Sequence, residues 1–303
     1  RPGTEKKVLW FDPQRKQTTS FSLVFVHGYG ASRQELSPLC EDLGKALHAN
    51  VFLTRLAGHG VTPAQMKEGT VRRWAQDVRE AIAIGRRIGN KVIVIGSSTG
   101  ATLAMWATTQ PFAQDILAHI WFSPNIGPKD KRSNVLLLPW GKRIGRMIAG
   151  PIRTWEPANP EQGKYWTTQQ PISSLAAMMG LVQVVRKIDV LRLSQPVLIF
   201  YSPKDQVLDV NKIRQMFQRM QSPRKKLIPI LNSGDPASHV LAGRILSPQT
   251  TSPVKQHILD FLTPHVAHIH PQNNTASTSA PSSARGTTPK PAPTSSDNPK
   301  NKQ

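Results

Sequence analysis

The sequence has a single cysteine, few acidic residues and no long apolar run. An internal disulfide is excluded because Cys40 has no second cysteine with which to pair. Cys40 lies among Leu36, Leu39 and Leu43 at helical spacing, which favours burial as a small hydrophobic side chain. No apolar segment approaches the length of about 20 residues that a membrane-spanning helix requires.

Acidic side chains are outnumbered: 18 Asp and Glu face 39 Lys and Arg, a formal net charge of +21. Such a field favours anionic surfaces, either nucleic acid or anionic lipid. Because no zinc-finger spacing, RNP-like aromatic pattern or basic coiled-coil region accompanies the charge, a nucleic-acid partner is disfavoured. The chain begins at Arg1 without an initiator methionine. The sequence therefore leaves open a removed signal peptide, a membrane anchor or a cytoplasmic location.

Short β-branched strands alternate with helical periods along most of the chain, which predicts a mostly parallel central sheet flanked by helices. Residues 1–124 and 191–263 form this α/β core. The alternation stops over residues 125–190, where prolines, tryptophans and short helical pieces indicate an inserted helical cap. Residues 264–303 are rich in Ser, Thr, Pro and Asn, a composition that predicts a disordered tail.

Individual elements follow from the same pattern. Residues 8–11 and 14–19 suggest an opening hairpin, and a helix is expected from 32 or 33 to about 47. Further strands are expected at 21–26, 51–56, 91–95, 117–122, 196–201 and 226–231. Helices are expected at about 101–109, 210–220 and 254–262, and from Val71 onward, where apolar residues recur at helical spacing.

The segment Gly96-Ser97-Ser98-Thr99-Gly100 has the form G-x-S-x-G. It lies between the apolar strand ending at Ile95 and an expected helix, and in this context the central serine is exposed on a sharp turn as a nucleophile. The alternative is a Gly/Ser-rich loop that binds phosphate, but the segment lacks the lysine and the glycine spacing of a P-loop. Ser98 is therefore the candidate nucleophile.

Acyl transfer needs amide donors aimed at the oxygen on which negative charge develops. Position predicts two backbone N–H groups for this oxyanion hole, those of Thr99, directly after the nucleophile, and Tyr29, after the His27-Gly28 turn. We expect His27 to brace its loop by hydrogen bonding. The side chain of Tyr29 either lines an acyl pocket or packs.

In α/β proteins whose nucleophile lies on a G-x-S-x-G turn, the histidine base follows the serine along the chain, and the acid lies between them. Among the histidines after Ser98, His119 falls in a strand, His257 on the last helix and three others in the tail, which leaves His239 in a loop after the last strand. Asp205 follows the strand at 196–201 and would orient the imidazole. Its rivals are Asp209, which suits a helix N-cap, and Asp235, which adjoins the histidine loop.

With these residues, the chain resembles the α/β-hydrolase superfamily, particularly its monoacylglycerol-lipase and carboxylesterase branch. The motifs that carry the resemblance are His27–Gly30, Arg55–Gly60, Gly96–Gly100, Ser202–Asp205 and Ser238–Leu241, in that order over about residues 8–262. The resemblance implies an α/β-hydrolase fold with an eight-stranded sheet and a cap between the sixth and seventh strands. It also implies hydrolysis of carboxylic esters through a covalent acyl-enzyme, with no cofactor and no metal. His59 matches a structural element of that branch.

The cap matches no lid that names a substrate, so the sequence assigns no substrate-binding residues. Its tryptophans and methionines either line an acyl pocket or form the cap's own core; they are Trp140, Trp155, Trp166, Met178 and Met179. Residues 135–138 lie near Lys142, Arg143 and Arg146, and the apolar Ile144, Met147 and Ile148 share a helical face. This pattern is consistent either with lid packing or with contact to an anionic membrane surface.

The sequence predicts a carboxylesterase or monoacylglycerol lipase-like serine hydrolase that acts on a small-molecule acyl ester. Two alternatives remain open. One keeps the triad in a thioesterase or peptidase. The other is a non-catalytic basic binding protein on the same scaffold.

Overall fold

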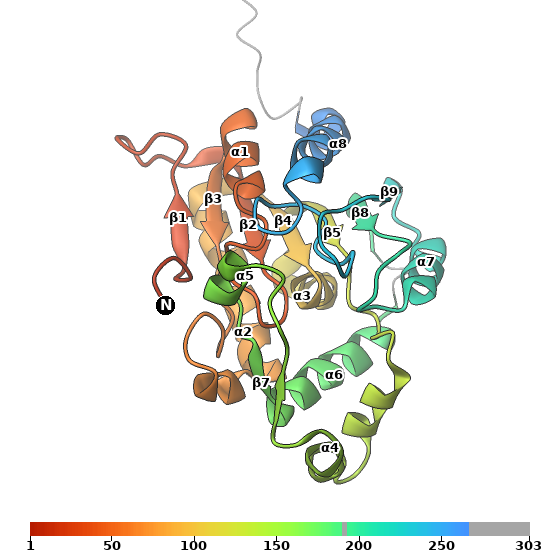
Figure 1. The fold of residues 1–303 in the computed structure, drawn as a ribbon. Helices are drawn as coiled ribbons and strands as arrows, with labels where there is room; N and C mark the ends of the chain where they lie inside the picture. The colour runs from red at the N-terminus through yellow and green to blue at the C-terminus, as the bar shows by residue number, and fades with distance from the viewer. Residues whose placement is uncertain (190–192, 267–303) are drawn as a thin grey trace, which may run out of the picture. The chain divides into compact units, whose positions relative to one another are not determined.

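A computed structural model describes residues 1–189 and 193–266 of the 303-residue chain. Its main feature is a seven-stranded sheet in the order β1-β3-β2-β4-β5-β8-β9, with helices on both faces (Figure 1). The strands are β1 (Lys7–Leu9), β2 (Thr19–Val26), β3 (Asn50–Leu53), β4 (Gly89–Ser97), β5 (Ile116–Phe122), β8 (Val197–Tyr201) and β9 (Lys225–Pro229). Only β1 is antiparallel to its neighbour, β3. The mostly parallel α/β architecture predicted from the sequence is thus confirmed.

The sheet buries both faces because successive apolar side chains point to opposite sides. In β2, Val24 and Val26 pack in one cluster with the helices α2 (Val71–Ile88), α3 (Thr99–Ala107) and α7 (Val210–Arg219). Phe21, Leu23 and Phe25 pack on the other side, with α1 (Leu39–Ala46) and α8 (Pro248–Val266). Cys40 is buried in this second cluster, as its helical neighbours predicted.

Three expectations about elements are wrong. The described residues form seven sheet strands, not eight, because the expected opening hairpin contributes only β1, which pairs with β3, and the polar residues 14–18 form no strand. The first helix begins at Leu39, not at Ser32 or Arg33, because Pro38 disfavours helical backbone in the residue before it. The last helix begins six residues early, at Pro248, and runs to Val266, so that its last three residues fall in the expected tail. The rest of the predicted tail lies outside the described residues.

The predicted cap segment lies between β5 and β8, the fifth and sixth strands of this sheet, and not between the sixth and seventh as expected, because the sheet has one strand fewer at its start. It contains the short helices η3 (Lys131–Leu137), α4 (Gly141–Ala149) and α5 (Pro160–Tyr165), and the longer α6 (Ile172–Arg186). A two-stranded antiparallel ribbon of β6 (Ile152–Thr154) and β7 (Gln169–Pro171), which the sequence pattern did not predict, joins these helices. No helix in the described part of the chain is long and apolar enough to cross a membrane.

Candidate active site

The nucleophile candidate occupies the sharp turn between β4 and α3. Ser98 has a positive φ of 50° with ψ of −113°, a region that non-glycine residues rarely adopt. Its amide donates to the carbonyl oxygen of Phe122 on the neighbouring strand (2.8 Å). The strain is therefore held by the sheet, and the serine side chain projects at the carboxyl end of a central strand, where ligands bind in open α/β sheets.

The two glycines of the motif are required by packing. A Cβ at Gly100 would overlap the carbonyl oxygen of Val26, and one at Gly96 would lie 2.6 Å from the Cα atom of Ala101. Strand β2, strand β4 and helix α3 thus approach each other with no room for a side chain at either position. The sequence G-x-S-x-G follows from this close approach.

The base and acid candidates lie in loops at the same end of the sheet. His239 Nδ1 and Asp205 Oδ2 are 2.9 Å apart, and their side chains are 13 % and 1 % exposed. The other oxygen of Asp205 accepts the amides of Val207 (2.7 Å) and Leu208 (2.9 Å), so the carboxylate is fixed and one oxygen remains for the imidazole. Such a bond sets the histidine tautomer, with Nε2 free to accept a proton.

The candidate nucleophile and the candidate base are linked by hydrogen bonds to the end of β5. The hydroxyl of Ser123 donates to the carbonyl oxygen of His239 (2.8 Å), and Ser123 directly follows Phe122, the partner of the Ser98 amide. Within the described residues, the Ser98 hydroxyl makes no hydrogen bond to the imidazole of His239. Catalytic hydrogen bonds are often long in unliganded enzymes and shorten when substrate binds.

The two alternative acids, Asp209 and Asp235, form hydrogen bonds with backbone amides instead. Asp209 caps α7 by accepting the amide of Asn211, as the sequence predicted. Asp235 accepts the amides of Ala237, His239 and Val240 and so shapes the turn that carries the base. Neither carboxylate is the hydrogen-bond partner of the His239 ring.

Burial opposes a positive charge on His239, but the carboxylates of Asp205, Asp235 and Glu35 outweigh it and raise its pKa. The imidazolium that forms when a base accepts a proton is stabilised by the same carboxylates. This arrangement suits a residue that takes a proton from a nucleophile and later returns it.

The loop after β2 holds the second oxyanion candidate. His27 Nε2 accepts the amide of Leu56 (3.1 Å), and its Nδ1 lies 2.9 Å from the carbonyl oxygen of Gly28, so the side chain braces the loop as expected. Burial lowers the pKa of His27 to about 3, which keeps the ring neutral. The amide of Gly28 donates to Glu35, which leaves the next amide, that of Tyr29, as the donor available at this turn. Thr99 begins α3, where amides lack an intrahelical acceptor.

Cap residues cover the Tyr29 turn. The amide of Thr167 donates to the carbonyl oxygen of Gly30 (2.7 Å), and the Tyr29 hydroxyl is 2.7 Å from the Ser174 hydroxyl on α6. The Tyr29 ring also meets His59 and Trp74 edge-on. Its side chain therefore packs between the core and the cap.

The aromatic and methionine side chains of the cap divide by role. Met179 and Trp166 are buried, and Met178 and Trp155 pack against apolar clusters, so these four belong to cores. Trp166 packs with Val240, next to the base candidate. Trp140 is 74 % exposed and belongs to neither cluster.

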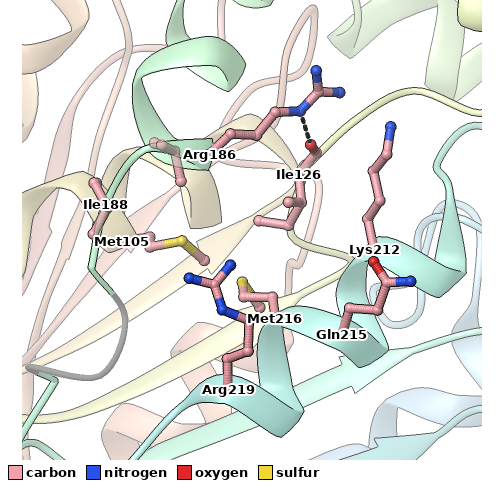
Figure 2. A pocket seen from close by; sticks show the side chains of 9 residues that line it. Met105, Ile126, Arg186, Ile188, Lys212, Gln215, Met216 and Arg219 are labelled. Atoms are coloured by element: carbon pink, nitrogen blue, oxygen red, sulfur yellow. Dashed lines mark hydrogen bonds between the residues drawn. The ribbon is translucent and has the colours of Figure 1, made fainter.

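A cavity of about 200 Å³ lies between α3, α6 and α7 (Figure 2). Methionines and aliphatic side chains form its floor, and Arg186, Lys212 and Arg219 border it. The Nε of Arg186 donates to the carbonyl oxygen of Ile126 (2.8 Å). None of the site candidates lines this cavity, so it is separate from the end of the sheet that carries Ser98.

The sequence patterns missed one residue of the site. Glu35 is 3 % exposed, and its Oε2 accepts the amide of Gly28 at 2.7 Å. Burial raises its pKa to about 7, against the opposing effects of the Gly28 amide, the charge of His239 and a hydrogen bond with Ser97. The only sequence signal was that Glu35 directly precedes the apolar Leu36 and Leu39, and the groups that the carboxyl group contacts can be identified only from the fold.

Comparison with known proteins places this geometry in a family. A thermostable monoacylglycerol lipase of Bacillus sp. (strain H-257) is 26 % identical over 224 residues, covering 73 % of this chain and 85 % of the relative. The structure of a Paleococcus ferrophilus monoacylglycerol lipase is 16 % identical with a TM-score of 0.64, covering 86 % of this chain and 98 % of the other. A soluble variant of Saccharomyces cerevisiae monoglyceride lipase, in complex with a substrate analogue, is 11 % identical with a TM-score of 0.66, covering 86 % and 91 %.

These two solved structures share the α/β-hydrolase fold with the chain. Residues 17–232, most of the sequence, match the family described as serine aminopeptidase, S33 (Hydrolase_4). The chain therefore belongs to the serine aminopeptidase S33 family, and its fold is that of the α/β-hydrolases.

Proposed function

We propose that this protein is a serine hydrolase that cleaves carboxylic esters, of the carboxylesterase or monoacylglycerol lipase type. The observation that carries the proposal is the strained Ser98 turn at the sheet end where Asp205 holds the ring of His239. The 26 % identical Bacillus relative is a monoacylglycerol lipase, which supports an acyl ester of a small alcohol as substrate.

The proposed reaction proceeds through an acyl-enzyme. His239 Nε2 takes the proton of the Ser98 hydroxyl as the serine oxygen attacks the ester carbonyl carbon. The amides of Tyr29 and Thr99 donate to the carbonyl oxygen as it becomes negative. His239 then gives the proton to the departing alkoxide, and afterwards activates the water molecule that releases the acid and restores Ser98.

Substitution of the nucleophile tests the proposal. We expect Ser98→Ala to lower kcat for p-nitrophenyl esters by a factor of roughly 10⁴ to 10⁶ and to abolish labelling by a fluorophosphonate probe. Ser222→Ala is the matched control, since this serine bonds to Gln195 in a distant loop. Unlabelled wild-type protein, or equal turnover in Ser98→Ala, would show that the assignment is wrong.

The acyl-enzyme mechanism also serves thioesters and peptides. Assaying acyl esters from acetyl to long-chain beside matching thioesters and aminoacyl amides separates these substrate classes. We expect kcat/KM to be highest for the esters. A higher value for thioesters or amides would favour the thioesterase or peptidase alternative.

We further propose that the enzyme works at an anionic lipid surface, which it contacts through the cap. A set of exposed apolar side chains, here called the cap ridge, comes from α4 and its flanks: Leu138, Trp140, Met147, Ile148 and Ile152, with exposures between 47 % and 85 %. On the apolar helical face that the sequence indicated, Met147 and Ile148 are exposed and Ile144 is partly buried. Val135, Leu136 and Leu137 are also partly buried.

Charge complementarity favours an anionic bilayer as the occupant. Residues 131–155 contain no acid, and six cations lie on and beside the ridge: Lys131, Arg132, Lys142, Arg143, Arg146 and Arg153. Of these, Arg132 pairs with Asp130. Apolar side chains ringed by cations suit insertion among anionic headgroups.

Vesicle sedimentation with and without phosphatidylserine tests the ridge. We expect a Trp140→Ser, Met147→Ser and Ile148→Ser triple variant to bind phosphatidylserine vesicles at least tenfold more weakly, with unchanged turnover of a soluble ester. Leu231→Ser, which removes an exposed apolar side chain elsewhere, should bind normally. Equal vesicle binding by the triple variant, or loss of self-association as its only effect, would overturn the lipid assignment.

A further inference from the structure

The carboxyl group of Glu35 meets all three segments of the candidate active site. Its Oε2 accepts the amide of Gly28 in the oxyanion loop (His27–Gly30), and Ser97, the residue before the candidate nucleophile, is a further hydrogen-bond partner. In the base loop (Ile230–Ser247), which connects β9 and α8, it interacts with the charge of His239. A Cβ at Gly28 would lie 2.8 Å from Glu35 Oε1 and 3.3 Å from the Cβ atom of Ser98, so carboxyl group and nucleophile flank the same glycine.

The backbone of Glu35 is fixed as well. Its amide donates to the carbonyl oxygen of Ser32 (3.0 Å), and the next side chain, Leu36, is buried in the core. On the other side, the backbone of Gly243 in the base loop packs against the Glu35 carbonyl oxygen so closely that a Cβ would not fit. The carboxyl group is therefore held in one place.

Burial of the Glu35 carboxyl group is energetically unfavourable. An ionised carboxylate in an apolar interior is strongly destabilising unless charges and hydrogen bonds compensate it. An amide or an alkyl side chain of similar size would fill this space without that cost. Nothing in the general base mechanism of Ser98, His239 and Asp205 uses the residue, so its position at the junction calls for another role.

We propose that Glu35 is a positioning residue of the active site, which fixes the oxyanion loop against the nucleophile turn and supplies negative charge to the base. The proposal rests on the proposed serine-hydrolase function. By holding the Gly28 amide, the carboxylate directs the adjacent Tyr29 amide toward the reacting carbonyl oxygen. Near and above its own pKa of about 7, where it is ionised, the carboxylate also favours the imidazolium form of His239 in the transition state.

The sign of the pH effect follows from the charged groups around the pair. His239 faces the carboxylates of Asp205, Asp235 and Glu35, and Glu35 in turn faces His239, Asp235 and the thiol of Cys40. A raised pKa means that His239 stays protonated, and inactive as a base, to a higher pH. Removing one neighbouring carboxylate therefore lowers the pKa of His239 and lets activity persist to lower pH.

The test compares Glu35→Gln and Glu35→Ala with the wild-type protein. In Glu35→Gln we expect the acidic limb of kcat/KM to move down by up to about 0.5 pH unit, because the charge of the Glu35 fraction that is ionised near pH 7 is lost while the amide oxygen still accepts the Gly28 amide. In Glu35→Ala we expect kcat to fall by about 100-fold with KM within threefold, because the oxyanion loop loses its anchor.

Glu41→Gln is the matched control. This glutamate lies six residues further along the same segment, bonds to the Ser37 hydroxyl, and is expected to leave rate and pH profile unchanged. The rate of fluorophosphonate labelling against pH gives a second readout that needs no ester substrate. An acidic limb in Glu35→Gln identical to wild type, or a kcat in Glu35→Ala within threefold of wild type, would overturn the proposal.

If Glu35→Ala fails to fold, Glu35→Gln decides alone, since glutamine keeps the size and the acceptor. The outcomes also separate the two proposals. A wild-type protein that neither labels nor turns over any ester contradicts the hydrolase function itself. An active wild type whose pH profile Glu35→Gln does not shift contradicts only the role of Glu35.

Discussion

Asp205, the acid of the proposed triad, is expected to act on the reaction through the ring of His239. Asp205 is almost fully buried, and its two oxygens divide between backbone amides and the imidazole. We expect Asp205→Asn to lower kcat for esters by about 10⁴-fold with little loss of folding, because an amide at this position permits the wrong histidine tautomer. Steady-state kinetics and circular dichroism measure the two effects.

A second aspartate on the same loop provides the control for that experiment. Asp209→Asn should keep full activity, because asparagine caps a helix about as well as aspartate. Should Asp209→Asn lose activity as severely as Asp205→Asn, the loop as a whole and not the Asp205–His239 contact would be responsible.

Among the elements, the strand–turn–helix unit around Ser98 requires glycine at position 100, where no side chain fits. We expect Gly100→Ala to destabilise the protein by about 3 kcal/mol, because the new methyl group collides with the Val26 backbone. Thermal unfolding followed by circular dichroism measures the loss. A glycine to alanine exchange with almost no loss of stability would mean that β2 and α3 can separate at little cost.

Gly180→Ala on α6 is the matched exchange. Its Cβ would make an ordinary contact with Val71 at 3.7 Å, and alanine favours the helix, so this variant should be as stable as the wild type or slightly more stable.

Elements also differ in how far the sequence predicts them. The core strands and α2 follow from apolar periodicity, and the Ser98 turn follows from a motif between a strand and a helix. The start of α1 depends on Pro38, and β6 and β7 depend on pairing between segments that show no alternation of their own. The sequence did not predict a role for Glu35 for a similar reason, because its partners Gly28, Ser97 and His239 come together only in the folded chain.

At the scale of the whole molecule, a net charge of +21 governs encounters with charged surfaces. We expect binding to phosphatidylserine vesicles to weaken as NaCl rises from about 0.05 M to about 0.5 M, since salt screens the cations. Turnover of a small neutral ester should change by less than about twofold, because its reaction involves no long-range attraction. Parallel vesicle sedimentation and ester assays measure both.

Salt should remove only part of the vesicle binding, because the exposed apolar side chains of the cap ridge do not depend on screening. Vesicle binding that is insensitive to salt would assign the contact to the ridge alone. Complete loss of binding at high salt would assign it to charge alone.

The hydrogen bond between the hydroxyls of Tyr29 and Ser174 has a consequence for access to the site. The residue whose backbone is proposed to stabilise the developing negative charge is tethered by its own side chain to α6. A lipid tail that pushes α6 outward must either break that tether or pull the turn with it. Movement of α6 that admits a bulky acyl chain would therefore displace the Tyr29 amide from its position in the oxyanion hole. A Tyr29→Phe exchange removes the hydroxyl, so α6 could then move without moving this turn.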